Sequence, residues 1–398
     1  MWFMINCKTI PQIRNARTAK KFFSSSLKAI FPSDNQQCRY SSGDIVRVLR
    51  NAISSGEYME TYLRNDLLKN DPSADTVFRR IRKIASEPGS HMRKGSKSHE
   101  RMSSHRGIDA ITGLIDLTVR IAIANGSFSH PVNVAIDEHD QPYYGMDNRY
   151  LIGVGSHKFR GTNRAYRFAT IESVKKGERF TLSVIRKDPL DGIDNATEVD
   201  LLLRHAISLG IPVGMVLMDR GYLDVGVMKK VEALHLGYII PAKDNPKVLG
   251  FERMEMKYCD RGLSYIVLND IIQSQSGKES VETMFVHMVY YPRGKMHDFS
   301  FYTNMNVNEN NVMELAETYR ERWGIENGYL EKSDTREKTH SPEMGVRYFL
   351  FFFSVLLYNL WMLLNLLRRM SGYVWFTLMD FLIAMSRGRW HKIMNDHG

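Results

Sequence analysis

The sequence contains little cysteine. Three cysteines occur in 398 residues, and Cys7, Cys38 and Cys259 lie far apart. This spacing excludes a disulfide framework and a cysteine-based zinc site, because both need several cysteines at short, regular intervals. The N-terminal segment also lacks an extended apolar run behind a basic start, so we identify no secretory signal. We therefore expect a reduced, intracellular protein in the cytoplasm.

Acidic residues are outnumbered. The chain has 54 lysines and arginines against 44 aspartates and glutamates, which gives a net charge of +10. Because the basic residues are spread widely, we expect a polyanionic partner, with nucleic acid ahead of an anionic membrane. A hydrophobic content of 43% and this length allow two or three folded domains with a core that can enclose an active site.

Long apolar runs are scarce. One segment, residues 348–367, is long enough to span a bilayer. Ser354, Asn359 and Asn365 interrupt it, and no second candidate span accompanies it. These features favour a wholly buried core helix over a membrane span.

The N-terminal third predicts helices over about 42–52, 57–69 and 71–83. Three helices with a basic last member are typical of helix-turn-helix DNA-binding domains. We therefore predict a helical DNA-binding region and basic linker over 1–107; a solvated basic helix face is the alternative. The predicted recognition helix carries Arg79, Arg80, Arg82 and Lys83.

Residues 108–249 alternate between helical and strand-like patterns, which predicts the first part of an α/β core. Residues 250–307 alternate apolar and polar side chains and predict a β-rich insertion. We expect the core to resume over 308–370 and to be followed by a basic tail over 371–398.

Two apolar strands of this core end in an aspartate. Asp137 follows one strand and Asp219 follows the other. Glu138 and Asp140 are rivals of Asp137, although strand alternation sends residues 137 and 138 to opposite faces. For Asp219 the alternative is a turn residue that caps the following helix.

A third carboxylate lies on a late helix. At about 100° per residue, Tyr319, Arg322 and Glu326 share one helix face, whereas Glu321 points away. A carboxylate beside a guanidinium suits metal and phosphate chemistry, but such a pair is also common on solvated helix surfaces. If Asp137, Asp219 and Glu326 converge, their oxygens suit Mg²⁺ or Mn²⁺, and we expect two ions that promote in-line phosphoryl transfer.

Residues from about 130 to 365 resemble the DDE transposases of insertion sequences, in the IS-four-like superfamily with an RNase H-like catalytic core. The motifs that carry the resemblance are the strand ending in Asp137, Met218-Asp-Arg-Gly-Tyr222 and Tyr319-x-x-Arg322-x-x-x-Glu326. The resemblance implies that Asp137, Asp219 and Glu326 form a catalytic metal-binding triad. It also implies that Tyr319 and Arg322 contact DNA phosphate near the transposon end.

The sequence departs from this family at one position. The signature has a lysine seven residues after the glutamate, where this chain has Ser333. Lys332 is one residue short and would need a shift of helix register to serve; Arg336 and Lys338 are other candidates for the contact.

Several neighbouring residues have two interpretations. Tyr319 could contact phosphate or pack in the core, and Trp323 and Tyr329 could stack on an unpaired base or pack internally. His139 and His157 lack metal-ligand spacing.

The resemblance implies a DNA transposase that cleaves transposon ends and joins the 3′ hydroxyl to target DNA. It implies a homodimer on DNA and, in a prokaryote, association with the nucleoid. A nuclease with the same fold but no strand transfer, and a catalytically decayed DNA-binding protein, are the alternative functions.

Overall fold

The computed structural model describes residues 13–31, 39–65, 70–85, 106–155, 158–175, 177–242, 257–259, 263–290 and 297–387. These residues belong to two units. The first comprises Met1–Ser127, Pro142–Tyr166 and Gly328–Gly398, and the second comprises Phe128–Gln141 and Arg167–Asn327. Most of the predicted linker over 86–107 lies outside the described residues.

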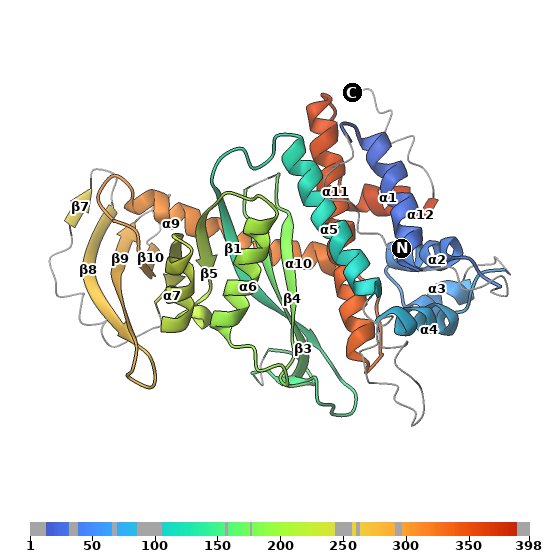
Figure 1. Cartoon of the computed structure of the whole chain (residues 1–398), viewed down its shortest axis with the longest axis horizontal. Helices are drawn as coiled ribbons and strands as arrows, with labels where there is room; N and C mark the ends of the chain where they lie inside the picture. The colour runs from blue at the N-terminus through green and yellow to red at the C-terminus, as the bar shows by residue number, and fades with distance from the viewer. Residues whose placement is uncertain are drawn as a thin grey trace. The chain divides into compact units, whose positions relative to one another are not determined.

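The second unit is organised around parallel strands (Figure 1). Strand β1 (Val132–Pro142) pairs in parallel with β5 (Val213–Met218), which pairs in parallel with β6 (Gly237–Pro241). Their sequences are short apolar runs, as expected for strands that are covered on both faces. Ile136 lies opposite Met218 in the register. The residues that follow them are Asp137, in the middle of β1, and Asp219, directly after β5, and they therefore lie on neighbouring strands at the same level of the sheet.

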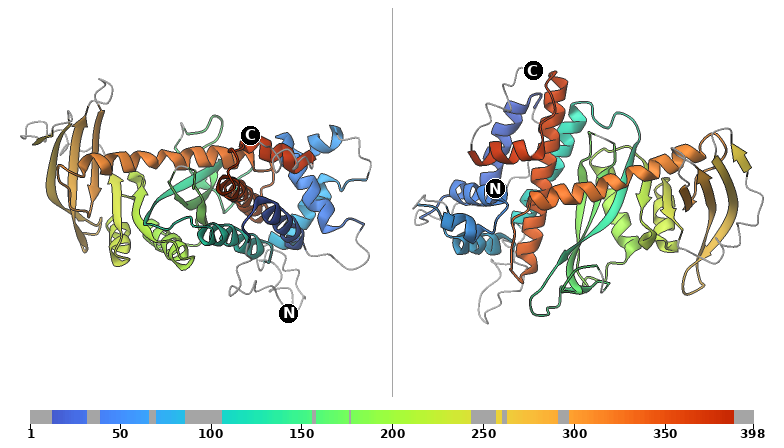
Figure 2. Two further views of the ribbon diagram at one scale, coloured as in Figure 1. Left: turned by 90° about the horizontal axis from the view of Figure 1, so that it is seen from above. Right: turned by 180° about the vertical axis from the view of Figure 1, so that it is seen from behind.

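Antiparallel strands complete this end of the sheet. Strand β3 (Arg164–Ser173) is the other neighbour of β1, and β4 (Thr181–Lys187) pairs antiparallel with β3. Helices α6 (Asn195–Ser208) and α7 (Val225–Ala233) cover one face of the unit, and α9 (Val312–Glu321) covers the other (Figure 2, left). The predicted α/β class is confirmed by this arrangement.

The predicted β-rich segment over 250–307 continues the core sheet. Strand β10 (His297–Thr303) pairs antiparallel with β6 and with β9 (Ser280–Tyr290). On its other side β9 pairs antiparallel with β8 (Leu263–Gln273), and β8 pairs antiparallel with β7 (Lys257–Cys259). The segment is thus an extension of the sheet through the β6–β10 pairing.

The predicted helix around residues 319–326 is divided by a tight turn at Arg322. Helix α9 ends at Glu321, and α10 (Trp323–Asp334) begins after Arg322. Arg322 N donates to Tyr319 O at 3.0 Å, and Ile325 N donates to Arg322 O at 2.8 Å. These i to i+3 bonds are the tighter spacing of a 3₁₀ turn, so the two helices meet at the arginine.

The first unit is helical around α11 (Met344–Met370), which packs against α5 (Arg106–Ala124). Buried Asn359 Nδ2 donates to buried Thr118 Oγ1 at 3.2 Å across this contact. In the described part of the chain, α11 is the helix long and apolar enough to cross a membrane, and its apolar window is completely buried. This burial agrees with the prediction of a core helix. The N-terminal helices of this unit are α1 (Ala16–Ile30), α2 (Ser42–Ser55), α3 (Met59–Asn65) and α4 (Ala74–Ala85).

The predicted boundaries at 107 and 371 differ from the observed grouping. Helix α4 packs against both α5 and α11, so the N-terminal helices share a core with later parts of the chain. Within the predicted basic tail, α12 (Leu378–Arg387) buries Phe381 and Leu382 and packs against α2. An amphipathic helix therefore occupies part of that tail; residues 388–398 lie outside the described part of the chain.

Candidate active site

The Asp219 carboxylate is fixed by the turn that follows β5. Gly221 N donates to Asp219 Oδ1 at 2.7 Å, so the side chain caps the short 3₁₀ helix Arg220–Tyr222. A Cβ at position 221 would lie 2.8 Å from the same oxygen. Glycine is therefore needed there for the carboxylate to keep its position.

Arg322 joins the late helices to β1. Its Nη1 lies 3.2 Å from Asp137 Oδ2, and its Nη2 lies 3.1 Å from Glu326 Oε1. Its Nε donates to the Tyr319 hydroxyl at 3.1 Å. The face predicted from residues 319, 322 and 326 is therefore formed, with the guanidinium at its centre. The exposed fractions of the side chains are 10% for Arg322, 16% for Asp137 and 58% for Glu326, so the group is open on the Glu326 side.

The electrostatics of Asp137 connect the three acids. Burial raises the pKa of Asp137 to about 6, Arg322 opposes this, and the charges of Asp219 and Glu326 raise the pKa further. Buried carboxylates near other carboxylates favour the protonated form. Three carboxylates with one guanidinium give a local charge of −3 + 1 = −2 when all are ionised.

The donor set fits a hard divalent cation, because every candidate ligand is a carboxylate oxygen. Among the described residues, no group of three or more His, Cys, Asp or Glu side chains is already spaced to hold a metal ion. Arg322 lies between the carboxylates of Asp137 and Glu326 and holds both as ion pairs. The chemistry of the site therefore suits a cation, whereas its present spacing is that of an arginine-bridged cluster.

Comparison with known proteins identifies the matching segment. Residues 193–360 match the family model described as Transposase DDE domain. The matched segment, which is less than half of the chain, is similar to this domain family. The match agrees with the resemblance drawn from the sequence. The match includes Asp219, Arg322 and Glu326, whereas Asp137 precedes it.

A solved structure supports the α/β fold of the chain. The chain is similar to a solved structure described as "Cryo-EM structure of piggyBac transposase synaptic complex with hairpin DNA (SNHP)", with a TM-score of 0.50 and 14% sequence identity. The similarity covers 96% of this chain and 81% of that chain. Among curated proteins, none matches. At this identity the likeness concerns the fold.

Tyr319 lies at the site but is largely enclosed. Its ring stacks on Phe299 with a centroid distance of 5.0 Å, and 8% of the residue is exposed. Burial raises the pKa of Tyr319 to about 12. The ring therefore packs in the core, as one interpretation of the sequence predicts. The hydroxyl contacts Arg322 and so lies at the site where the other interpretation expects a phosphate contact.

Lys332 does not extend the site. The residue is 1% exposed, and its ammonium lies 4.5 Å from the ring centre of Tyr329 and 5.3 Å from that of Tyr358. These cation–π contacts occupy the lysine within the first unit. The predicted phosphate contact finds no support at this position, and Tyr329 is enclosed with it. The Trp323 side chain lies outside the described residues.

The other basic residues that we proposed as phosphate contacts differ in their contacts within the protein. Lys338 donates to Gly56 O at 2.5 Å. On α4, Arg80 donates to Tyr40 O at 3.1 Å, and Arg82 pairs with Glu343 at 2.7 Å. Arg79 and Lys83 are the exposed pair on α4.

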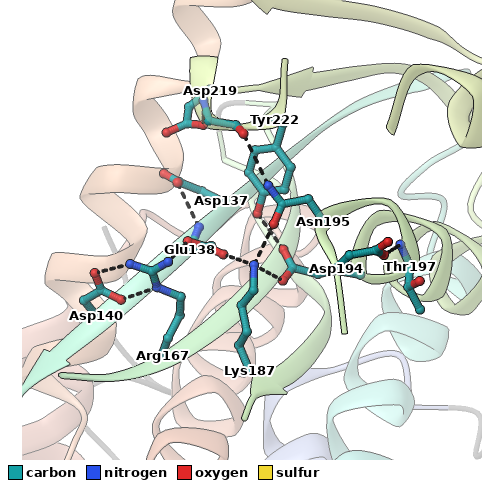
Figure 3. Close-up of polar contacts among 12 residues, drawn as sticks. Asp137, Glu138, Asp140, Arg167, Lys187, Asp194, Asn195, Thr197, Asp219 and Tyr222 are labelled. Atoms are coloured by element: carbon teal, nitrogen blue, oxygen red, sulfur yellow. Dashed lines mark hydrogen bonds and ion pairs between the residues drawn. The ribbon is translucent and has the colours of Figure 1, made fainter. Parts of the chain in front are cut away.

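Sequence reasoning missed a set of buried and half-buried charges on the opposite face of β1 (Figure 3). From the sequence we considered Glu138 only as an alternative to Asp137 for the first catalytic acid. In the structure it forms ion pairs with Lys187 and Arg167 instead. Glu198 of α6 joins the same group. The available signal was strand alternation, which sends Glu138 away from the face of Asp137.

Proposed function

We propose that this chain is a metal-dependent DNA transposase of the IS-four-like type, with an RNase H-like core. In this proposal it cleaves the ends of its element and joins the 3′ hydroxyl to target DNA. The observation that carries the proposal is the convergence of Asp137 and Glu326 on Arg322, with Asp219 at the adjacent strand end, in a chain whose residues 193–360 match the transposase DDE family model.

Asp137, Asp219 and Glu326 are the residues that would hold Mg²⁺ or Mn²⁺. When bound, two such ions supply activation of the attacking oxygen and stabilisation of the leaving oxygen. The local charge of −2 and the raised pKa of Asp137 support this role, because a cation relieves repulsion between carboxylates.

Arg322 has a second role in the proposal. Its planar guanidinium holds two carboxylates now, and the same donor geometry suits phosphate oxygens. Tyr319 supports it from the Nε side at 3.1 Å. We therefore assign Arg322 to orienting the acids and binding the phosphate at the transposon end.

DNA is the partner in this proposal. The similar piggyBac structure is described as a synaptic complex with hairpin DNA, and this chain carries a net charge of +10. The proposal includes a homodimer on DNA and, in a prokaryote, a location at the nucleoid. Exposed Arg79 and Lys83 on α4 are the best candidates for phosphate contacts outside the catalytic site.

Cleavage of a DNA fragment that bears the element's own ends tests the function. With Mg²⁺ present, we expect wild type to cut at the ends and Glu326→Gln to lose cutting, while Glu317→Gln, an exposed acid on α9, cuts normally. Equal cutting by Glu326→Gln contradicts the assignment of the site. Adding target DNA and probing for joined products separates a transposase from a nuclease. Binding without any cutting by wild type would identify a decayed copy.

A salt titration tests the α4 contacts. If Arg79 and Lys83 bind phosphate, each alanine variant reduces the slope of log affinity against log salt by about 1. Lys28→Ala, which changes an exposed lysine of α1, serves as the control for a general charge effect. An unchanged slope in both α4 variants would remove that helix from the DNA interface.

A further inference from the structure

Glu138 begins a chain of buried contacts on the opposite face of β1 from Asp137. The Lys187 ammonium, at the end of β4, pairs with the Glu138 carboxylate and also lies 3.1 Å from Glu198 Oε2. Glu198 belongs to α6 and is completely buried. Burial lowers the pKa of Lys187, but the charges of Glu198 and Glu138 outweigh it and raise the pKa overall, which keeps the ammonium charged.

The contacts continue to the turn that holds Asp219. The Tyr222 hydroxyl donates to Glu198 Oε1 at 2.7 Å, and Tyr222 is 2% exposed. Tyr222 is three residues beyond Asp219. Asn195 makes a parallel connection: Lys187 Nζ donates to its Oδ1 at 2.7 Å, and its Nδ2 donates to Gly221 O at 3.3 Å (Figure 3).

Glu138 is held from its other side by Arg167. Arg167 Nη1 lies 2.6 Å from Glu138 Oε2, while its Nε and Nη2 donate to the two oxygens of Asp140 at 2.6 and 2.8 Å. Such bidentate pairs restrict the geometry of both partners. Glu138 is therefore fixed by two cations, and its backbone N–H donates to Asp137 Oδ1 at 2.9 Å.

We propose that Lys187, Glu198 and Tyr222 are positioning residues that set the separation of Asp137 and Asp219. They form a continuous path from Glu138, beside the first aspartate, to Tyr222, in the turn of the second. This inference rests on the proposed function, because it concerns the acids assigned there to metal binding.

A positioning role explains why charged groups are buried at this place. Desolvating an ion pair costs free energy that its attraction often fails to return, so an apolar pair would fill the same space at less cost. The residues beside metal ligands orient those ligands, and changing them typically weakens metal binding by about 10- to 100-fold. None of the three side chains needs to touch the substrate for this effect.

Titration of the full chain with Mn²⁺ alone, followed by electron paramagnetic resonance, tests the inference. We expect Tyr222→Phe to raise the Mn²⁺ concentration at half-saturation by about 10-fold or more. The matched control is Tyr238→Phe, which removes another buried hydroxyl of the same sheet, one that donates to Thr283 Oγ1 at 3.0 Å. The control should lower the melting temperature to a similar extent and leave Mn²⁺ affinity unchanged.

Conservative rescue provides a second readout. Lys187→Arg, which keeps the positive charge, should retain tighter Mn²⁺ binding than Lys187→Met. If core variants fail to fold, Asn195→Ala decides the question, because Asn195 is only half-buried and its loss cuts one of the two connections to the turn after Asp219. We expect weaker Mn²⁺ binding in this variant also.

The outcomes separate this inference from the proposed function. Wild-type affinity in Tyr222→Phe, or in Asn195→Ala where the former does not fold, overturns the positioning role. Asp137→Asn is measured alongside. If it binds Mn²⁺ as wild type does, the proposed metal site fails; if it loses binding while Tyr222→Phe does not, the positioning role alone fails.

Discussion

The two faces of β1 each gather three carboxylates but differ in the number of cations that accompany them. On the first face, one arginine gives a local charge of −3 + 1 = −2; on the second, a lysine and an arginine give −3 + 2 = −1. The first face comprises Asp137, Asp219, Glu326 and Arg322, and the second comprises Glu138, Asp140, Glu198, Lys187 and Arg167.

The faces also differ in access to water. The Glu326 side chain is 58% exposed, whereas those of Asp140 and Glu198 are completely buried. Exposed carboxylates in excess over local cations can accept an ion from solution, whereas buried, paired ones cannot do so without opening the fold. We infer that the first face is built to bind and the second to support it.

The largest expected difference between the faces is catalytic. Replacing the acid by Asp137→Asn should reduce DNA cleavage by roughly 10³-fold or more, because it removes a charge that stabilises the transition state. Single-turnover cleavage of end-bearing DNA measures this effect. Asp298→Asn, an acid of β10 with a 60% exposed side chain, is the control and should cleave as wild type does.

A second comparison concerns stability on the supporting face. Lys187→Met leaves buried Glu198 and half-buried Glu138 without their shared ammonium, so we expect the free energy of unfolding to fall by about 3 kcal/mol. Urea denaturation measures the loss. Arg204→Met removes an exposed arginine that pairs with Asp200 on α6, and it should change the free energy of unfolding by less than about 1 kcal/mol. A small effect of Lys187→Met would remove the distinction between the faces.

The binding face should instead carry a stability cost that depends on pH. The pKa of Asp137 is about 6 in the folded chain, above its ordinary 3.8, so the folded state holds the proton more strongly. Protonated Asp137 does not destabilise the folded chain below pH 4. Its ionisation lowers the free energy of unfolding progressively as the pH rises through 6. Asp137→Asn should therefore be more stable than wild type by about 1–3 kcal/mol at pH 7.5, with no gain at pH 4. Denaturation at both pH values measures the difference, and equal gains at the two would contradict the assigned cause.

The smallest effect is expected at the exposed end of the binding face. Glu326→Gln should change the free energy of unfolding by less than about 1 kcal/mol, because a largely exposed ion pair contributes little. The same variant should lose cleavage. A strong destabilisation, measured by urea denaturation, would mean that Glu326 supports the fold and would weaken its assignment to the site.

The sequence predicted the binding face better than the supporting face. Asp137 and Asp219 each follow a short apolar run, and helical spacing places residues 319, 322 and 326 on one side of the chain despite the break at Arg322. Local spacing was therefore sufficient to identify the acids. The contacts of Lys187 have no such pattern, since Glu138 lies 49 residues away in sequence. A buried lysine and an exposed one have the same local sequence pattern, and tertiary contacts alone distinguish them.

The fold was predictable where periodicity is local. The α/β core, the β-rich segment and the buried helix α11 follow from apolar patterns, whereas the parallel pairing of β1 with β5 does not. The pairing of β10 with β6 does not, because alternation indicates a strand without indicating its neighbour. The break at Arg322 was missed because helical spacing does not distinguish a 3₁₀ turn from a continuous helix. Helix α12 was missed because its apolar residues lie in a segment that we interpreted as a basic tail.

The adjacent acids of β1 have one more consequence, for insertions and deletions in the gene. A one-residue slip of this strand would exchange its two faces. If one residue were deleted before Asp137, Glu138 would take its place and face Arg322 with a side chain one methylene longer, about one carbon–carbon bond or ~1.5 Å. His139 would take the place of Glu138. The binding face would therefore keep a carboxylate, whereas the supporting face would lose the one that pairs with Lys187 and Arg167.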